Sequence, residues 1–182
     1  AARKENPEVA RIILDAYPQA ASKKDKYGRF PLHEAASNSN PEVVRMILKQ
    51  NPRAAFEKDN DGELPLHKAA SNSNPEVVKI ILDAHPKAIV AKNFLGEKTP
   101  LDLAKIQDHL NVIKVLESAL DKFMDRVPKE FICPITSDIM NDPVMAEDGN
   151  TYERAAIVQW FEDHNTSPLT NVVLESKKVI LN

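Results

Sequence analysis

The sequence predicts a mainly helical repeat solenoid over residues 1–127 and a small α+β domain over residues 128–182. Gly28, Gly62 and Gly96 lie 34 residues apart, a period typical of solenoids with one supersecondary unit per repeat. The charge changes where the period ends. The last 55 residues hold four basic and nine acidic residues, a net of −5, whereas residues 1–127 have a net of +2.

The composition excludes several classes of protein. Hydrophobic residues make up 42% of the 182 residues, enough for packed cores and against wholesale disorder. A single Cys allows no internal disulfide, so we expect an intracellular location, cytoplasmic or nuclear. The sequence has no apolar run long enough for a membrane span and no clustered basic residues of the kind that bind nucleic acid. Because the chain begins at Ala1, we expect a fragment whose targeting segments lie elsewhere.

Each repeat begins with a turn and a short helix. Residues 25–28 and 59–62 combine Asp or Asn with Gly, which are turn-forming residues. A helix is expected from Pro31 and from Pro65, because Pro suits the first helical turn. Paired alanines in both helices allow two layers of helices to approach closely.

A second helix follows in each repeat. Asn40 is expected to cap it, Pro41 to begin it, and Glu42 to favour the positive end of the helix dipole. Its apolar residues lie on one side: Val43, Val44, Ile47 and Leu48. The helix should end near Asn51-Pro52. Residues 31–48 and 65–82 are identical at fifteen of eighteen positions, so both repeats should share one structure.

This turn-helix-helix pattern resembles the ankyrin repeat over about residues 5–120. The family motif TPLHxA is matched at residues 31–35, 65–69 and 99–104. Phe30 and Leu64 stand where the family has Thr, which predicts loss of a Thr–His hydrogen bond. The first copy, at Asn6-Pro7-Glu8-Val9, keeps only its second helix. The third copy has one inserted residue and has Asp102 instead of His. It continues into a helical tail to residue 126.

Variable residues at the turn tips predict a surface that recognises a protein substrate, because the helices between them hardly change. These tip residues are Tyr27, Arg29, Asp61, Glu63, Phe94 and Glu97. The alternative is that any one of them is merely solvated. His33 and His67 could suggest a metal site, but they have no partner ligands at suitable spacing. Their repeat position instead favours structural hydrogen bonding.

The last third predicts a different set of elements. A compact loop at residues 133–136 precedes a strand at 144–146, and a turn at 147–150 closes a hairpin at Thr151-Tyr152. A helix should follow from Glu153 to about Asp163, and a second loop at residues 164–170. Two loops flanking a hairpin and a helix are typical of RING domains.

Zinc is not expected to organise this domain, because the stretch contains one Cys and one His. Short polar side chains are plentiful instead, and hydrogen bonds among them would each contribute about 1 kcal/mol. The candidates are Ser137, Asp138, Asn141, Asp142, Glu147, Asp148, Thr151, Arg154 and Asn182. We therefore expect neither a metal nor another cofactor.

Residues 128–182 resemble the U-box, the zinc-free relative of RING found in ubiquitin ligases. The matching pieces occur in order: residues 131–136, Met140 with 142–144, residues 149–154, Ile157 with Trp160, and residues 167–170. The usual C-terminal helix of the family is missing, so the domain should be truncated at its C-terminus.

The U-box resemblance implies that this domain binds a ubiquitin-conjugating enzyme and promotes direct transfer of its ubiquitin to a substrate lysine. The ligase would supply proximity and orientation rather than a nucleophile. The positions that match the family's docking patch are Ile135, Trp160 and Pro168. Independently, Ile157 and Phe161 are expected to face the core, which leaves Trp160 toward an edge. The alternative is that Trp160 fills the core.

Two positions depart from the family, and a third invites a different mechanism. Asn171 stands where many active members have an Arg that orients ubiquitin, and Asn lacks the charge and reach of Arg. Leu181 replaces a Pro that the family favours. Cys133 suggests a covalent ubiquitin carrier, but its setting favours a buried structural thiol.

The sequence thus predicts an intracellular ubiquitin ligase, with the solenoid holding a substrate and the U-box-like domain holding the loaded conjugating enzyme. The alternative is a non-catalytic interaction scaffold with a silent U-box-like module. The oligomeric state stays open, because related domains occur as dimers and as monomers.

Overall fold

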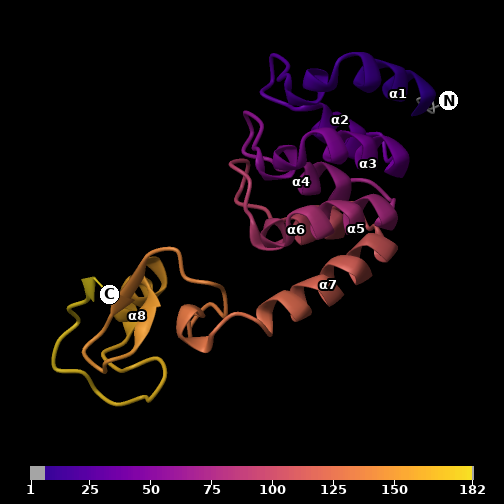
Figure 1. The fold of residues 1–182 in the computed structure, drawn as a ribbon. Coiled ribbons are helices and arrows are strands. Elements are labelled where there is room, and N and C mark those ends of the chain that lie inside the picture. Colours follow the sequence, from indigo (N-terminus) through magenta and orange to yellow (C-terminus); the bar gives the residue numbers. More distant parts are fainter. Residues whose placement is uncertain (1–6, 182) are drawn as a thin grey trace. The chain divides into compact units, whose positions relative to one another are not determined.

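A computed structural model describes residues 7–181, and the chain divides into two compact units between Met124 and Asp125 (Figure 1). The domain boundary predicted between residues 127 and 128 stays a prediction. Across residues 7–181, no helix combines the length and apolar character needed to cross a membrane.

The N-terminal unit consists of stacked helix pairs, which confirms the predicted helical solenoid (Figure 1). Its helices are α1 (Pro7–Ala16), α2 (Pro31–Ser37), α3 (Pro41–Gln50), α4 (Pro65–Ala70), α5 (Pro75–Ala84), α6 (Pro100–Ile106) and α7 (Leu110–Met124). Helices α2, α4 and α6 stack in one layer, and α1, α3, α5 and α7 in the other. After α1, α3 and α5 the chain makes short 3-10 turns that were not predicted, at Pro18–Ser22, Pro52–Phe56 and Pro86–Val90.

The helix ends follow the predicted capping chemistry. The Asn40 side chain accepts hydrogen bonds from the N–H groups of Glu42 (3.1 Å) and Val43 (3.3 Å). Asn74 accepts from Glu76 in the next repeat, at 3.0 Å. These bonds satisfy N–H groups that the helix itself leaves unpaired. Asn6, expected to begin the first copy, lies outside the described residues.

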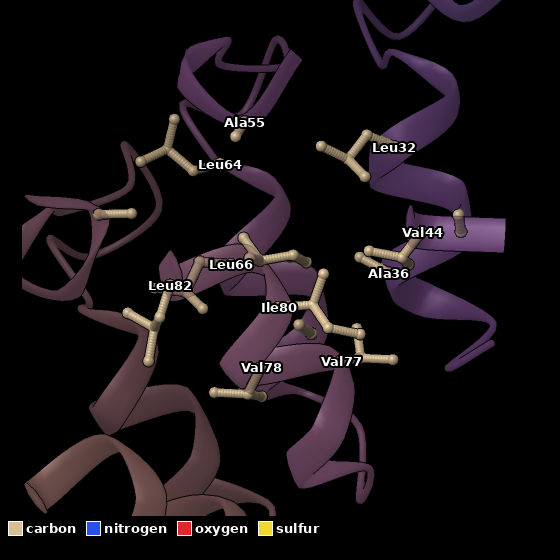
Figure 2. Close-up of a cluster of buried hydrophobic side chains, with 14 of the residues drawn as sticks. Leu32, Ala36, Val44, Ala55, Leu64, Leu66, Val77, Val78, Ile80 and Leu82 are labelled. Atoms are coloured by element: carbon tan, nitrogen blue, oxygen red, sulfur yellow. The ribbon is translucent and has the colours of Figure 1, made fainter. Parts of the chain in front are cut away.

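The core of this unit runs between the two helix layers (Figure 2). Leu32 of α2, Val44 of α3, Leu66 of α4 and Val78 of α5 are fully buried. Ala36 is also fully buried, and its small side chain lets α2 pack closely against its neighbours. Burial of each large side chain contributes about 1.5–3 kcal/mol.

The buried histidines join neighbouring repeats. His33 Nδ1 accepts from the Phe30 N–H at 3.1 Å, and its Nε2–H donates to the Glu63 carbonyl at 3.1 Å. His67 repeats the arrangement with Leu64 and Ala91 at the same distances. Desolvation lowers the pKa of both imidazoles, which keeps them neutral. The predicted structural role is confirmed, because both ring nitrogens already have partners.

Phe30 and Leu64 lack the Thr hydroxyl that the family has at this position. In these two repeats the backbone N–H of Phe30 or Leu64 donates to the Nδ1 atom of His33 or His67 instead. In the third repeat, Thr99 is present and Asp102 replaces His. There the Asp102 carboxylate accepts from the Thr99 N–H (2.8 Å) and from its hydroxyl (2.7 Å). The start of helix α6 therefore keeps its cap although Asp102 replaces His.

The turns between repeats stack on one another. The Asn60 N–H donates to the Tyr27 carbonyl at 3.0 Å, and the Phe94 N–H donates to the Asp61 carbonyl at 2.9 Å. Gly62 has a left-handed φ of +74°, and a Cβ placed on it would lie 2.6 Å from the Phe94 ring. This position thus needs glycine both for its backbone conformation and for the close approach of Phe94.

The C-terminal unit is a small α+β fold, as predicted. It contains a 3-10 turn (Lys129–Phe131), β1 (Pro143–Met145), β2 (Thr151–Glu153), helix α8 (Arg154–Asp163) and β3 (Ile180–Leu181). The strands are antiparallel in the order β2-β1-β3, with Val144 opposite Tyr152 and Leu181. The predicted hairpin and helix are confirmed, although β3 was not predicted.

Six buried residues form the core of the C-terminal unit: Cys133, Val144, Ala146, Tyr152, Ile157 and Phe161. Ile157 and Phe161 lie one turn apart on α8 and both face this core, as the sequence predicted. The core therefore joins the first loop, the hairpin and the helix.

We predict that Gly62→Ala destabilises the protein more than Gly96→Ala. Gly96 has φ +81°, and a Cβ there would have only Lys98 nearby, at 3.7 Å, so its cost is the left-handed backbone alone, about 1 kcal/mol. Gly62→Ala adds the clash with Phe94 and should cost about 2–3 kcal/mol.

Denaturant unfolding followed by circular dichroism measures both costs. Adding Phe94→Ala to Gly62→Ala should return most of the difference. Equal losses for the two glycines would show that the turns do not stack as described.

Candidate functional site

Two loops of the C-terminal unit have the same backbone geometry 34 residues apart. In the first loop, residues 133–137, the Ser137 N–H donates to the Cys133 carbonyl at 2.8 Å. In the second, residues 167–171, the Asn171 N–H donates to the Ser167 carbonyl at 2.9 Å. Ser137 and Asn171 both have a left-handed φ of +60°. The loops are therefore two copies of one structural motif.

The first residue of each loop holds the turn together through its side chain. Ser167 Oγ accepts from the N–H groups of Leu169 (3.3 Å) and Thr170 (3.0 Å). Cys133 Sγ accepts from the Glu153 N–H at 3.3 Å. Burial raises the pKa of the Cys133 thiol, but hydrogen bonds from backbone N–H groups, that of Glu153 first, outweigh burial and lower the pKa.

Asp148 fastens the second loop to the hairpin. One of its carboxylate oxygens accepts from the Ser167 hydroxyl at 2.5 Å and from the Tyr152 hydroxyl at 2.7 Å, and the other accepts from the Asn150 N–H at 2.9 Å. Burial raises the pKa of Asp148, but these donors outweigh burial and lower it overall. Burial raises the pKa of Tyr152 to about 12, so its hydroxyl stays a donor.

A second group of polar contacts fastens the segment after the first loop. The Glu153 carboxylate accepts from the N–H groups of Asn141 (2.7 Å) and Asp142 (3.2 Å). Asp142 also pairs with Arg154 at 2.6 Å. Glu147 accepts from the Ser176 N–H at 2.6 Å. Together with those of Asp148, these contacts fasten the second loop and the segments that follow both loops.

The predicted polar set is thus partly correct. The side chains of Asp142, Glu147, Asp148 and Arg154 take part as expected. Ser137, Asp138 and Asn141 contribute through their backbones, while Asn182 lies outside the described residues. Sequence reasoning missed Tyr152, Glu153 and Ser167. The repeated patterns Cys-Pro-Ile-Thr and Ser-Pro-Leu-Thr were the signal that could have identified Ser167.

The three predicted docking residues lie on the two loops and on the helix between them. Ile135 and Trp160 are partly exposed and pack against the same core cluster. Trp160 Nε1–H donates to the Thr166 carbonyl at 2.7 Å, which holds Trp160 beside the loop that carries partly exposed Pro168. Leu169, the counterpart of Ile135 in the second loop, is 57% exposed. These four residues are called the loop-helix surface below.

The predicted tip residues of the solenoid divide into two groups. Tyr27, Asp61, Phe94 and Glu97 are exposed, and the Phe94 side chain is 69% exposed. Arg29 and Glu63 are instead held in ion pairs within their own repeats. The four exposed tips are available for a partner.

The ion pairs of Arg29 and Glu63 have opposite polarity in successive repeats. Arg29 pairs with Glu34 at 3.2 Å, whereas the equivalent Glu63 pairs with Lys68. Lys68 also contacts Asp59 at 3.0 Å. The reversal exchanges the partners but keeps an ion pair at the same place, so these two tip residues stabilise their own turns.

No group of three or more His, Cys, Asp or Glu side chains suited to a metal occurs within residues 7–181. In the two loops, Cys133 Sγ and Ser167 Oγ are engaged in the hydrogen bonds given above.

Comparison with known families covers nearly the whole chain. The family described as ankyrin repeats (3 copies) matches residues 1–93 and 53–124, and the U-box domain family matches residues 127–182.

Individual relatives share only a short stretch with this chain. U-box domain-containing protein 35 of Arabidopsis thaliana is 45% identical over 75 residues, 40% of this chain and 9% of that protein. Human WD repeat, SAM and U-box domain-containing protein 1 is 44% identical over 68 residues, 37% of this chain and 14% of that protein. A probable bifunctional E2/E3 enzyme of Acanthamoeba polyphaga mimivirus is 48% identical over 56 residues, 31% of this chain and 4% of that protein.

We predict that Asp148→Asn lowers the unfolding free energy of the C-terminal unit by about 2 kcal/mol, because two buried hydroxyls lose a charged acceptor. Trp160 is the only Trp, so its fluorescence during denaturation reports on this unit alone. Asp142→Asn is the control, and it should cost less because Asp142 is exposed.

The pH dependence gives a second test of the same contact. Folding lowers the pKa of Asp148 below the ordinary value of 3.8, so its ionised carboxylate stabilises the folded unit at pH values above 3.8. This stabilisation is lost as the pH falls through the lower pKa of the folded state. The stability difference between wild type and Asp148→Asn should therefore shrink in acid. A constant difference would contradict a role for the ionised carboxylate.

Proposed function

The chain belongs to the ankyrin-repeat family and carries a U-box domain, and from this premise we propose that it is a ubiquitin-protein ligase. The family names support ubiquitin ligation in general terms, since one relative is named as an E2/E3 enzyme. The observation that best supports this proposal is the loop-helix surface. It would bind a ubiquitin-loaded conjugating enzyme, and the solenoid would bind the substrate.

The chemistry of the loop-helix surface suits a protein partner. Partly exposed Ile135, Trp160 and Pro168 and exposed Leu169 are apolar, and aromatic residues of this kind are frequent energetic anchors of interfaces. The polar contacts of Asp148 and Glu153 fix the loops that present them. A preformed surface loses little conformational entropy on binding, which favours affinity.

The geometry supports transfer without a covalent intermediate on this protein. Cys133 is fully buried, and its Sγ already accepts a hydrogen bond from the Glu153 N–H. A lowered pKa does not make a buried thiolate accessible to a thioester. The proposed contribution is proximity: the conjugating enzyme's thioester and a substrate lysine are held together on one chain.

The substrate would be a protein held by the exposed tips of the solenoid, Tyr27, Asp61, Phe94 and Glu97. Exposed aromatic side chains such as Tyr27 and Phe94 supply apolar area with few rotatable bonds. We place the activity in the cytoplasm or nucleus, since the single Cys133 is a free thiol.

Asn171 favours a second candidate function, an interaction scaffold without ligase activity. Its exposed side chain stands where the family resemblance implies a ubiquitin-orienting Arg. The left-handed φ of +60° gives a separate reason for Asn at this position, because Asn tolerates that conformation better than most residues.

We predict that Ile135→Ala reduces autoubiquitination by the full chain at least tenfold, because an apolar anchor of the loop-helix surface is removed. Cys133→Ser should retain activity, since no thioester forms on this residue. The assay uses E1, a panel of conjugating enzymes and ubiquitin, with folding checked by circular dichroism. Loss of activity in Cys133→Ser despite a folded chain would favour a covalent carrier.

We also predict that Asn171→Arg increases the rate of ubiquitin discharge from the conjugating enzyme to free lysine by several-fold, since Arg adds charge and reach. Asn171→Ala is the control for the backbone conformation. No discharge by wild type, with discharge only by Asn171→Arg, would instead support the scaffold function.

A further inference from the structure

His164 lies directly on the indole ring of Trp160. The two ring centroids are 4.0 Å apart and the rings are inclined by only 14°. Both the backbone N–H and the Nδ1–H of His164 donate to the Trp160 carbonyl, each at 3.1 Å. His164 ends α8 and is itself exposed. A solvent-exposed side chain thus takes a fixed position against a residue of the loop-helix surface.

Three contacts therefore fix the orientation of Trp160. Its Nε1–H is bonded to the Thr166 carbonyl at 2.7 Å, its ring packs against the core cluster, and one ring face is covered by His164. An indole held in this way keeps its remaining exposed surface in one orientation. An interface anchor that is already ordered avoids part of the entropy cost of binding.

From this arrangement we infer that His164 is a positioning residue for docking of the conjugating enzyme: its ring holds the Trp160 indole in the orientation that the partner contacts. The inference rests on the proposed function. It differs from a capping role, in which only the hydrogen bond from Nδ1 to the end of α8 would matter.

Two substitutions separate the ring from the hydrogen bond, and His164→Ala removes both. His164→Phe keeps an aromatic ring over Trp160 but cannot donate from the side chain, whereas His164→Asn keeps a polar donor and loses the ring. His85→Ala is the control in the solenoid, because the His85 and Phe56 rings have the same 4.0 Å centroid separation, with a larger tilt of 36°. Ile135→Ala serves as the reference for a lost docking contact.

The experiment uses the full chain and a conjugating enzyme that supports its activity. Calorimetry gives the dissociation constant, steady-state discharge gives KM and kcat for the loaded enzyme, and fluorescence anisotropy reports the mobility of the single Trp. We expect His164→Asn and His164→Ala to raise the dissociation constant and KM by about threefold to tenfold, the range that aromatic pairs contribute. They should leave kcat unchanged and increase Trp160 mobility, whereas His164→Phe and His85→Ala should behave like wild type.

Several results would overturn the inference. Unchanged binding in His164→Ala, with binding lost in Ile135→Ala, would remove the role of His164 and leave the proposed function in place. Normal binding by His164→Asn and weak binding by His164→Phe would assign the effect to the cap. If wild type binds no conjugating enzyme, the proposed function and this inference both fail.

Discussion

The carboxylate of Asp148 is the contact on which the C-terminal unit depends most. It accepts from a hydroxyl on the hairpin, Tyr152, and from a hydroxyl on the second loop, Ser167. Without it, the irregular backbone of the second loop would lose its side-chain tie to the hairpin, whereas the first loop is held through Cys133 and Glu153. Charge-assisted hydrogen bonds are strong enough, and directional enough, to fix such loops. The hydrogen bonds to Asp148 therefore help to fix the positions of the residues in the loop-helix surface.

The solenoid is held together by side-chain contacts that recur from repeat to repeat. His33 and His67 each tie a helix start to the next repeat, so the frame is constant while the exposed tips vary. Where a substitution breaks the pattern, a second one compensates for it. Asp102 with Thr99 replaces the histidine cap, and Glu63 with Lys68 replaces Arg29 with Glu34. A constant frame with variable tips supports the proposal that the solenoid binds a protein substrate.

Sequence periodicity was sufficient to predict the helix pairs, because the caps at Asn40 and Asn74 and the buried stripes depend on local spacing. The site was predictable only in part. Asp148 was identified as a polar candidate, but its partner Ser167 lies 19 residues away, and such pairing depends on tertiary structure. Strand β3 was missed because an edge strand of only two residues is too short to show an alternation of apolar and polar residues. The contact between His164 and Trp160 needed coordinates, since spacing alone does not orient two rings.

We propose that hydrogen bonds, and not a metal, shape the loop-helix surface on which a conjugating enzyme would dock. The most direct measurement is titration of the full chain with a conjugating enzyme before and after exhaustive chelation, combined with elemental analysis. We expect the same dissociation constant in both cases and zinc far below one equivalent. Stoichiometric zinc, or binding that disappears on chelation and returns with added metal, would contradict it.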